Sequence, residues 1–191
     1  MSNRTIRSCV LLAAAALLLL APLAWAFASP DGDDYDQAGM EYQVKAAFLF
    51  HFAEFVDWPS HKFTQPDSPL VIGIIGSDPF GGLLEEAVQD KRINDRVVII
   101  RHVEAMEELR KCHMIFICRS EADRLGPILS EVRGDNVLTV GETDKFISHG
   151  GMINFVMMGD TVRFQINDSA ARRAGLKISS KLSSLAIPTE R

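Results

Sequence analysis

Short, largely apolar runs alternate with amphipathic stretches along the middle of the chain. The apolar runs are typical of buried strands and occupy residues 70–75, 96–100, 114–118 and 137–140. Stretches with helical spacing lie between or beside them, at residues 79–89, 104–110 and 121–133. Strands that alternate with helices predict right-handed βαβ units. We therefore expect an α/β fold whose mostly parallel sheet carries helices on both faces.

The stretch before the first strand predicts a long helix over residues 41–58. Its apolar positions recur at helical spacing, and they include Val44, Phe48, Phe52 and Phe55. Pro59 should end the helix, because a proline pushes the residue before it out of the helical region. The helix is therefore expected to be buried on most sides.

The pattern changes after Gly150, where two β-rich runs flank Gly159-Asp160. Residues 152–158 and 161–166 therefore predict a β-hairpin. In the second run apolar and polar residues alternate, so one face of that strand should be buried and the other wet.

Two helices are predicted after the hairpin. Asn167 or Asp168 is suited to cap a helix that stops at Gly175. Residues 178–186 then predict a final helix. The domain is thus expected to end with a C-terminal hairpin followed by helices.

Residues 1–26 carry the features of a secretory signal peptide. A positive start precedes an uncharged run, and small residues recur around Ala26 and Ala28, where cleavage is expected. An uncleaved membrane anchor is the alternative, because the uncharged stretch is close to the ~20 residues that a membrane span needs. Both interpretations send the rest of the chain across a membrane. We expect a flexible acidic leader over residues 27–40 and one α/β domain over residues 41–188.

The charge of the chain argues against one class of partner. The formal net charge is −5, and without the two arginines of the signal peptide 18 basic residues stand against 25 acidic ones. Nucleic-acid binding needs a positive face that neutralises phosphates, and no such basic stretch is present. No nucleic-acid partner is expected.

Cys112 and Cys118 are the cysteines of the predicted domain. The export signal would permit a disulfide. The stretch between them, HMIFIC, reads as a strand, and six residues of strand rise about 20 Å. Bridged Cα atoms lie within about 7 Å, so these two cysteines should not pair with each other. We expect buried free thiols.

The turn GIIGSDPFGG at residues 73–82 resembles a phosphate-binding loop only in part. The lysine and the hydroxyl residue that complete a P-loop are missing, and Asp78 would repel a phosphate. The simpler interpretation is that Ser77 or Asp78 caps a helix whose first position is Pro79. The turn still follows a parallel strand, where α/β sheets bind ligands, so a small-molecule site at Ser77, Asp78 and Phe80 stays open.

No catalytic constellation is visible in the sequence. There is no nucleophile elbow, and the five histidines are not at metal-ligand spacing. We expect no enzyme activity, no cofactor and no metal site.

Several segments together resemble a known family. They are LFHFAEFVDWP, GIIGSDPFGG, HMIFIC, VLTVGE, GGMINFVMMGDTVRFQIN and AARRAGLKISSKLSSLA, in this order. The set is similar to the YfiR/HmsC-like family of bacterial periplasmic proteins, from about Tyr42 to Ala186. The resemblance implies a periplasmic repressor without enzymatic activity. Such a protein acts on the periplasmic part of an inner-membrane diguanylate cyclase and lowers cyclic-di-GMP and biofilm output. Other members are thought to serve membrane sensor kinases or cyclases.

The chain departs from this family at its cysteines. Some members carry a cysteine pair around the Gly-Gly hairpin, and Ile147 and Asn154 stand at those positions here. A redox switch of that kind is therefore not expected. The resemblance also implies that Cys112 is one half of another bridge, whose partner position near Gly73 has no thiol.

The hairpin and the turn after it are the predicted partner surface. Its expected contact residues are Met152, Ile153, Asn154, Arg163, Gln165 and Asn167. Flexible methionines, including Met157 and Met158, suit an adaptable surface. The alternative is that the methionines fill the core, which we favour more for Met158 than for Met152.

A second function stays open beside the repressor. The domain could be a small-ligand-binding module that feeds a membrane receptor kinase or cyclase, with the turn at residues 76–82 as its site. The expected partners are thus an inner-membrane signalling protein and, less directly indicated, a small ligand or a second copy in a homodimer.

Overall fold

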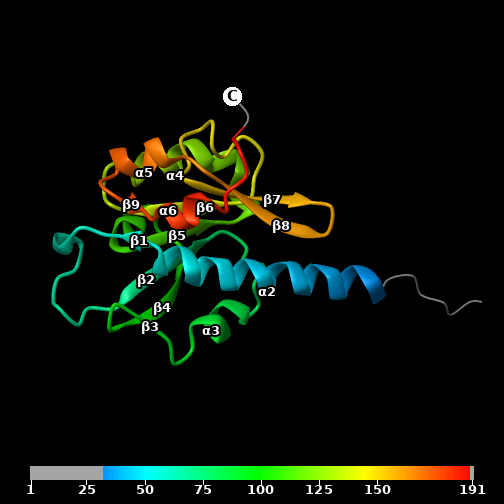
Figure 1. The fold of residues 1–191 in the computed structure, drawn as a ribbon, viewed down its shortest axis with the longest axis horizontal. Helices are drawn as coiled ribbons and strands as arrows, with labels where there is room; N and C mark the ends of the chain where they lie inside the picture. The colour runs from blue at the N-terminus through cyan, green and yellow to red at the C-terminus, as the bar shows by residue number, and fades with distance from the viewer. Residues whose placement is uncertain (1–31, 190–191) are drawn as a thin grey trace, which may run out of the picture. The chain divides into compact units, whose positions relative to one another are not determined.

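The computed structural model describes residues 32–189, and its centre is a seven-stranded sheet (Figure 1). The strands are β2 (Leu70–Ile75), β3 (Arg92–Ile93), β4 (Arg96–Val103), β5 (Met114–Ile117), β6 (Leu138–Gly141), β7 (Ile153–Met158) and β8 (Thr161–Ile166). Their order is β3-β4-β2-β5-β6-β7-β8. All pairings from β4 to β7 are parallel, whereas β3–β4 and β7–β8 are antiparallel. The predicted mostly parallel sheet with a C-terminal hairpin is confirmed.

Helices cover both faces of this sheet, because successive side chains of each central strand point to opposite sides. In β2, Ile72 and Ile74 belong to one apolar cluster, while Val71 and Ile75 belong to another. The first cluster includes α2 (Gly32–Glu54), α3 (Leu83–Val88), α5 (Asp168–Arg173) and α6 (Ser180–Ser183). The second includes the 3₁₀ segment η2 (Met106–Lys111) and α4 (Leu125–Glu131). This is the predicted α/β fold, and residues from Gln37 onward form one compact unit.

Helix α2 is shifted at both ends from the helix predicted over residues 41–58. It begins at Gly32, inside the predicted leader, and ends at Glu54, four residues before Trp58. It stops early because Val56–Asp57 (β1) pairs antiparallel with Lys177–Ile178 (β9). The predicted signal peptide, residues 1–26, and the start of the leader lie outside the described residues.

The same pairing corrects the predicted final helix over residues 178–186. Ile178 lies in β9, and only Ser180–Ser183 forms the helix α6. The Ser179 side chain caps that helix by accepting from the Lys181 N–H. Sequence periodicity could not show this, because β9 exists only through its distant partner strand.

Two other predicted helices are shorter or tighter than expected. The segment predicted at residues 104–110 is the 3₁₀ segment η2. The segment at residues 121–133 divides into the 3₁₀ segment η3 (Arg119–Arg124) and α4. Pro127 lies in the first turn of α4, where a missing N–H breaks no helical hydrogen bond. The two-residue strand β3 was not predicted.

Candidate interaction surface and ligand pocket

The turn after β2 fills the crevice in which a ligand was considered. Gly76 has a φ of +99°, and a Cβ there would lie 2.4 Å from Ser120 Oγ and 2.8 Å from Glu121 Cγ. The Ser77 N–H donates to Ser120 Oγ at 2.9 Å. The turn therefore packs against the segment that follows β5, at the point where the strand order reverses.

Asp78 and Phe80 hold this turn in place. The Phe80 N–H donates to Asp78 Oδ1 at 2.8 Å, and Asp78 Oδ2 lies 2.8 Å from His102 Nε2. Phe80 is 2% exposed and packs edge-on against Tyr42 and Phe116. Its ring is thus part of the core and cannot receive a ligand.

The predicted helix start at this turn is wrong. Helix α3 begins at Leu83, with Gly82 at its N-cap and no side-chain cap. Pro79 therefore precedes the helix by several residues, and Asp78 closes a local turn instead of capping. The glycine-rich turn therefore anchors the chain between β2 and α3.

The predicted partner residues divide into buried and exposed groups. Met152, Ile153 and Asn154 are buried, so they offer no contact surface in this fold. Arg163 is exposed on β8, and Gln165 is partly exposed on the same strand. The hairpin thus brings together only part of the predicted surface.

Asn167 has a structural task in addition to its partial exposure. Its side-chain oxygen accepts from the Ala170 N–H at 3.1 Å, and this caps α5 as predicted. Its own N–H donates to Met152 O at 2.7 Å and closes the base of the hairpin. Replacing Asn167 would therefore disturb the fold as well as any contact.

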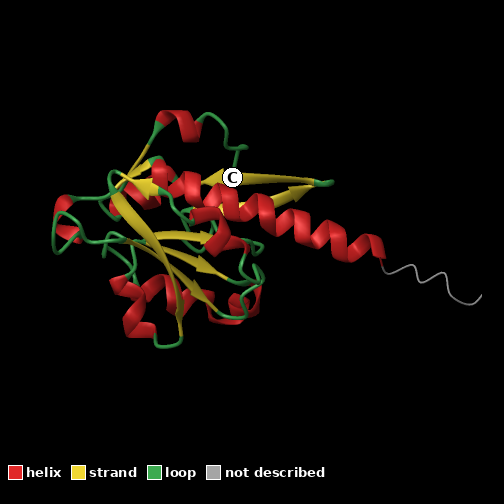
Figure 2. Ribbon diagram, turned by 90° about the horizontal axis from the view of Figure 1, so that it is seen from below, coloured by secondary structure: helices red, strands yellow, loops and turns green. Residues whose placement is uncertain are grey.

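The hairpin methionines are placed opposite to expectation. Met158 is 56% exposed and Met157 38%, whereas Met152 is 6% exposed and packs in the core. The reason is that the tip of the hairpin projects beyond the ends of β5 and β6 (Figures 1 and 2), so the described part of the chain leaves Met158 mostly uncovered. The methionines at the tip, not Met152, form the exposed apolar part of the hairpin.

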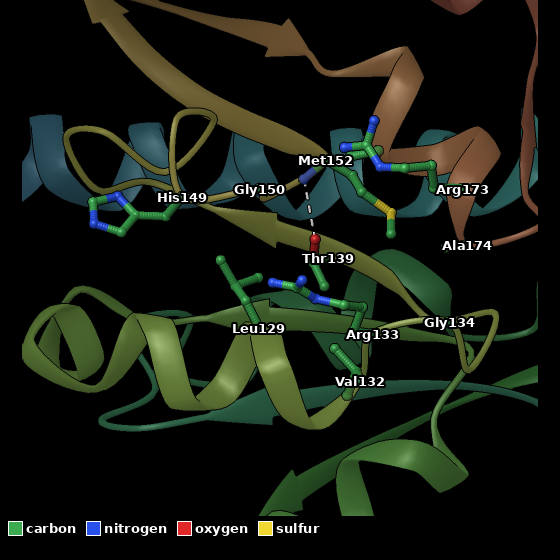
Figure 3. Close-up of a pocket in the computed structure, with 11 residues that line it drawn as sticks. Leu129, Val132, Arg133, Gly134, Thr139, His149, Gly150, Met152, Arg173 and Ala174 are labelled. Atoms are coloured by element: carbon green, nitrogen blue, oxygen red, sulfur yellow. Dashed lines mark hydrogen bonds between the residues drawn. The ribbon is translucent and has the colours of Figure 1, made fainter.

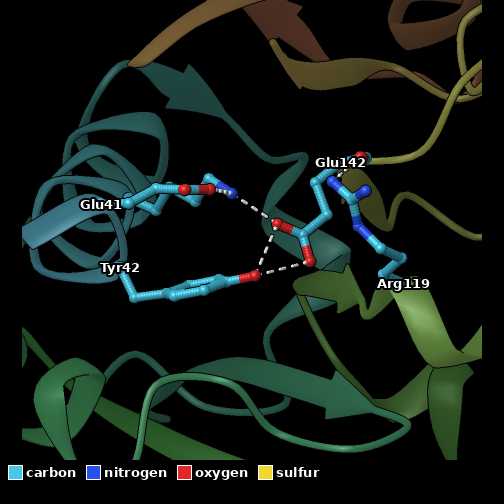
Figure 4. A network of polar contacts seen from close by, with 5 residues as sticks. Glu41, Tyr42, Arg119 and Glu142 are labelled. Carbon is cyan, nitrogen blue, oxygen red and sulfur yellow. Dashed lines mark hydrogen bonds and ion pairs between the residues drawn. The ribbon is translucent and has the colours of Figure 1, made fainter. Parts of the chain in front are cut away.

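A charged network lies beside the carboxyl ends of the strands (Figure 4). Lys45 of α2 is 1% exposed, and its Nζ contacts Glu142 Oε2 at 2.5 Å and also Glu41. The Tyr42 hydroxyl donates to both carboxylate oxygens of Glu142 at 3.2 Å. Burial raises the pKa of Tyr42 well above its usual value, and the negative charges of Glu142 and Glu41 raise it further. The network ties α2 to the turn after β6.

A pocket of about 450 Å³ lies between α4, β6 and α5 (Figure 3). Its walls include the apolar residues Leu129, Val132 and Met152. Arg133, which follows α4, and Arg173, which belongs to α5, bring guanidinium groups from opposite sides. Inside, Thr139 Oγ1 accepts from the Met152 N–H at 3.0 Å.

This pocket suits an anion with an apolar body, because guanidinium groups pair with carboxylates and the walls are apolar. It was not found from the sequence. Arg133 and Arg173 are forty residues apart, and neither stands in a recognisable motif. Only the fold, which places the end of α4 and helix α5 on opposite sides of the pocket, brings them together.

The comparison with known proteins gives the family. The sequence matches the YfiR/HmsC-like family over residues 42–187. The chain belongs to this family. YfiR/HmsC-like proteins are periplasmic regulators, so the coarse prediction of an exported regulatory protein is supported. Among curated proteins none matches the sequence.

One solved structure shows a similar fold in another protein. A conserved domain protein from Vibrio cholerae O1 biovar eltor has a TM-score of 0.51 at 10% identity, over 76% of this chain and 58% of that one. This chain thus spans a little over half the length of that protein. The ABC domain in complex with L-Trp from Streptococcus pneumonia has a TM-score of 0.44 at 14% identity, over 61% and 53% of the two chains.

The cysteines of this YfiR/HmsC-like protein are free and buried, as predicted. Burial raises the pKa of both thiols, and burial together with nearby carboxylates raises the pKa of Cys118 to about 12. A Cβ built on Gly73 would lie 2.7 Å from Cys112 Sγ. The position opposite Cys112 is thus where the family resemblance placed a missing thiol.

Two features are not found among the described residues. No helix among residues 32–189 is long and apolar enough to cross a membrane. Within the same range, no group of three or more His, Cys, Asp or Glu side chains could hold a metal ion.

Proposed function

We propose that this protein binds the periplasmic part of an inner-membrane signalling protein and restrains it, with a diguanylate cyclase as the foremost partner. Binding would lower cyclic-di-GMP and biofilm output. The observation that carries this proposal is membership of a periplasmic regulator family over nearly the whole described domain. The protein would act by contact, without a reacting group of its own.

The exposed part of the hairpin is the proposed contact surface. Arg163 supplies a charge beside Gln165, and Met157 and Met158 supply exposed, adaptable apolar area at the tip. An exposed mixture of apolar and polar groups of this kind is typical of transient interfaces. The surface is smaller than predicted, because Met152, Ile153 and Asn154 are buried.

Charge reversal at Arg163 tests the proposal. In the source bacterium, deletion of the gene should raise cyclic-di-GMP, and the wild-type gene should lower it again. Arg163→Glu should leave the unfolding midpoint of the purified protein unchanged and fail to lower cyclic-di-GMP. Lys111→Glu, which changes an exposed charge elsewhere, is the matched control. If Arg163→Glu restores repression fully, the hairpin is not the contact surface.

A second candidate function is a small-ligand-binding module that feeds a membrane receptor. The pocket with Arg133 and Arg173 favours it, and moves the site away from the turn at Ser77 and Asp78. Phenylacetate and phenylpropionate, which combine a carboxylate with an apolar body, are suitable probes. They should raise the melting temperature of the wild-type protein but not of Arg173→Ala. The variant Arg124→Ala is the control and should show the same rise in melting temperature as the wild type. No rise in the wild type would count against the ligand-binding module.

A further inference from the structure

Strand β7 has neighbours on both sides only at its beginning. All six of its residues pair with β8. On the other side β6 pairs with Ile153 and Asn154 alone, because β6 ends at Gly141. Past Asn154, no described strand lies against this edge of β7. The free stretch is the part of the hairpin that projects beyond the sheet (Figures 1 and 2).

The hairpin turn decides which backbone groups face the open edge. Gly159-Asp160 is a two-residue turn, so Met158 and Thr161 form the hydrogen-bonded pair that closes it. Hydrogen-bonded and non-hydrogen-bonded pairs alternate from there, which makes Met157 and Val162 a non-hydrogen-bonded pair. The N–H and C=O of Met157 therefore point away from β8, toward the open side.

The outer edge of β8 confirms this alternation. By the same rule Phe164 O should point outward from the hairpin, and it accepts the Ile187 N–H at 2.9 Å. The C-terminal segment thus occupies one edge of the hairpin. The outward-facing N–H and C=O of Met157 on β7 have no such neighbour among the described residues.

The space beside the open edge is a pocket of about 240 Å³, which we call the β7 notch. Thr143 and Asp144 line it on the side of β6, Arg119 lies at the end of β5, and the Lys45–Glu142 pair is among its walls. Thr143 Oγ1 and Asn154 Oδ1 are shielded from solvent and have no hydrogen-bond partner among residues 32–189. The notch is thus bordered by unpaired backbone and side-chain polar groups, which favour an occupant that can both donate and accept.

One face of the notch is apolar. Phe155 packs against Phe48 and Phe52 of α2, so Met157, two residues on, faces the same side. Met157, which lines the notch, is 38% exposed. A strand added beside β7 would place alternate side chains over this apolar area.

We propose that the β7 notch receives an extended segment of the inner-membrane signalling partner, which adds as a strand to the open edge of β7. The inference rests on the proposed function and names the way the partner docks. Main-chain hydrogen bonds to Met157 supply the binding, and apolar residues at alternate positions of the segment face α2. The added strand continues the sheet where β6 stops.

Met157→Pro tests the backbone contact directly. Proline at this position removes the N–H that faces the open edge together with the methionine side chain, and it takes no donor from the β7–β8 hydrogen bonds. Met157→Ala is the matched control, because it removes the side chain but keeps the N–H. Both purified variants are first compared with the wild type by circular dichroism and thermal unfolding. Each gene is then returned to the deletion strain, and cyclic-di-GMP is measured.

The expected result is that Met157→Ala still lowers cyclic-di-GMP, by less than the wild type because it gives up apolar contact area, whereas Met157→Pro leaves it at the level of the deletion strain. Equal repression by Met157→Pro overturns strand addition while the proposed function stands. Loss of repression in both variants also overturns it, because the side chain would then be the determinant. If the wild type itself does not lower cyclic-di-GMP, the proposed function fails and the inference fails with it.

Two further measurements keep the proposal falsifiable. Size-exclusion chromatography with light scattering compares wild type and Met157→Pro; a wild-type dimer that the variant converts to monomer assigns the edge to a second copy and overturns the partner strand. Should Met157→Pro unfold, a photo-crosslinking amino acid replaces Met158 in the otherwise native protein. It should crosslink to the membrane cyclase in cells, and the same group at exposed Val97 should not. Equal crosslinking from both positions overturns the proposal.

Discussion

The amino and carboxyl ends of the parallel strands differ in whether their hydrogen-bonding groups are covered and paired. At the amino ends the chain seals the sheet: Trp58 Nε1 donates to His113 O at 2.9 Å, and Phe63 stacks on the His113 ring at 4.4 Å. Lys62 Nζ donates to Asp135 O at 2.7 Å across the same edge. At the carboxyl ends the Lys45–Glu142 pair lies beside an open notch and an unpaired strand edge.

This difference assigns recognition to the carboxyl ends, while both ends contribute to stability. The sealed end satisfies backbone groups with nearby side chains and leaves little for a partner to bind. The open end keeps hydrogen-bonding groups free, and a buried ion pair holds its walls together. Substitutions at either end should therefore lower stability, but only those at the open end should also change partner binding.

The largest expected effect is at the open end. Lys45→Met should lower the free energy of unfolding by about 3–5 kcal/mol, because it leaves the buried Glu142 carboxylate without its cation. Urea unfolding followed by Trp58 fluorescence measures this. Lys45→Met combined with Glu142→Gln should recover a large part of the loss. A cost below about 1 kcal/mol for the single variant would show that the pair does not hold α2 to the sheet.

The next effect is at the sealed end and depends on pH. Burial, together with the positive charges of Lys62 and Arg96, lowers the pKa of His113 to about 4. The unfolded chain binds a proton there below about pH 6.5, while the folded chain stays neutral down to about pH 4. Stability from this group is therefore complete above pH 6.5 and falls by up to about 3 kcal/mol as the pH drops to 4.

His113→Gln provides the comparison for that pH effect. Glutamine cannot take up a proton, and its carbonyl can still accept from the Val71 N–H, which now donates to His113 Nδ1. Urea midpoints of both proteins are measured at pH 7.5 and pH 4.5. The wild type should lose more stability between the two values. Parallel losses would mean that His113 does not titrate as its burial predicts.

The smallest effect is expected from an exposed ion pair near the sealed end. Arg110 Nε lies 2.9 Å from Glu131 Oε1 and 3.3 Å from Asp135 Oδ2, and its side chain is mostly in solvent. Arg110→Ala should cost less than about 1 kcal/mol, and the difference should shrink in 1 M salt. A large loss of folding free energy that does not depend on salt would show that Arg110 contributes to the packing at the amino ends of the strands.

Sequence patterns predicted the elements that continuous apolar runs define. Strands β2 and β5 lie within the apolar runs predicted as strands at residues 70–75 and 114–118, because strands buried on both faces need apolar side chains at every position. The cap at Asn167 was also predictable, since it depends on residues within one turn. Local chemistry was enough in these cases.

Long-range contacts account for what the sequence did not show. Lys45 stands among apolar residues of α2, and its partner Glu142 is 97 residues away. β9 exists through its pairing with β1, and this pairing ends α2 earlier than predicted and delays the start of the last helix. The sequence favours a core position for Met158, and only the end of β6 at Gly141 explains why this residue is exposed. The candidate surface therefore depended on where one strand stops, which periodicity does not report.

The bond from Ile187 N–H to Phe164 O has a practical consequence for anyone who prepares this protein. A truncation before Ile187, or a bulky fusion that pulls the tail away, would bare a second strand border on β8. Concentrated samples of such a version should self-associate, and a loss of repression in it would be misread as a defect in the regulator. Affinity handles are better inserted in a surface loop than at the C-terminus.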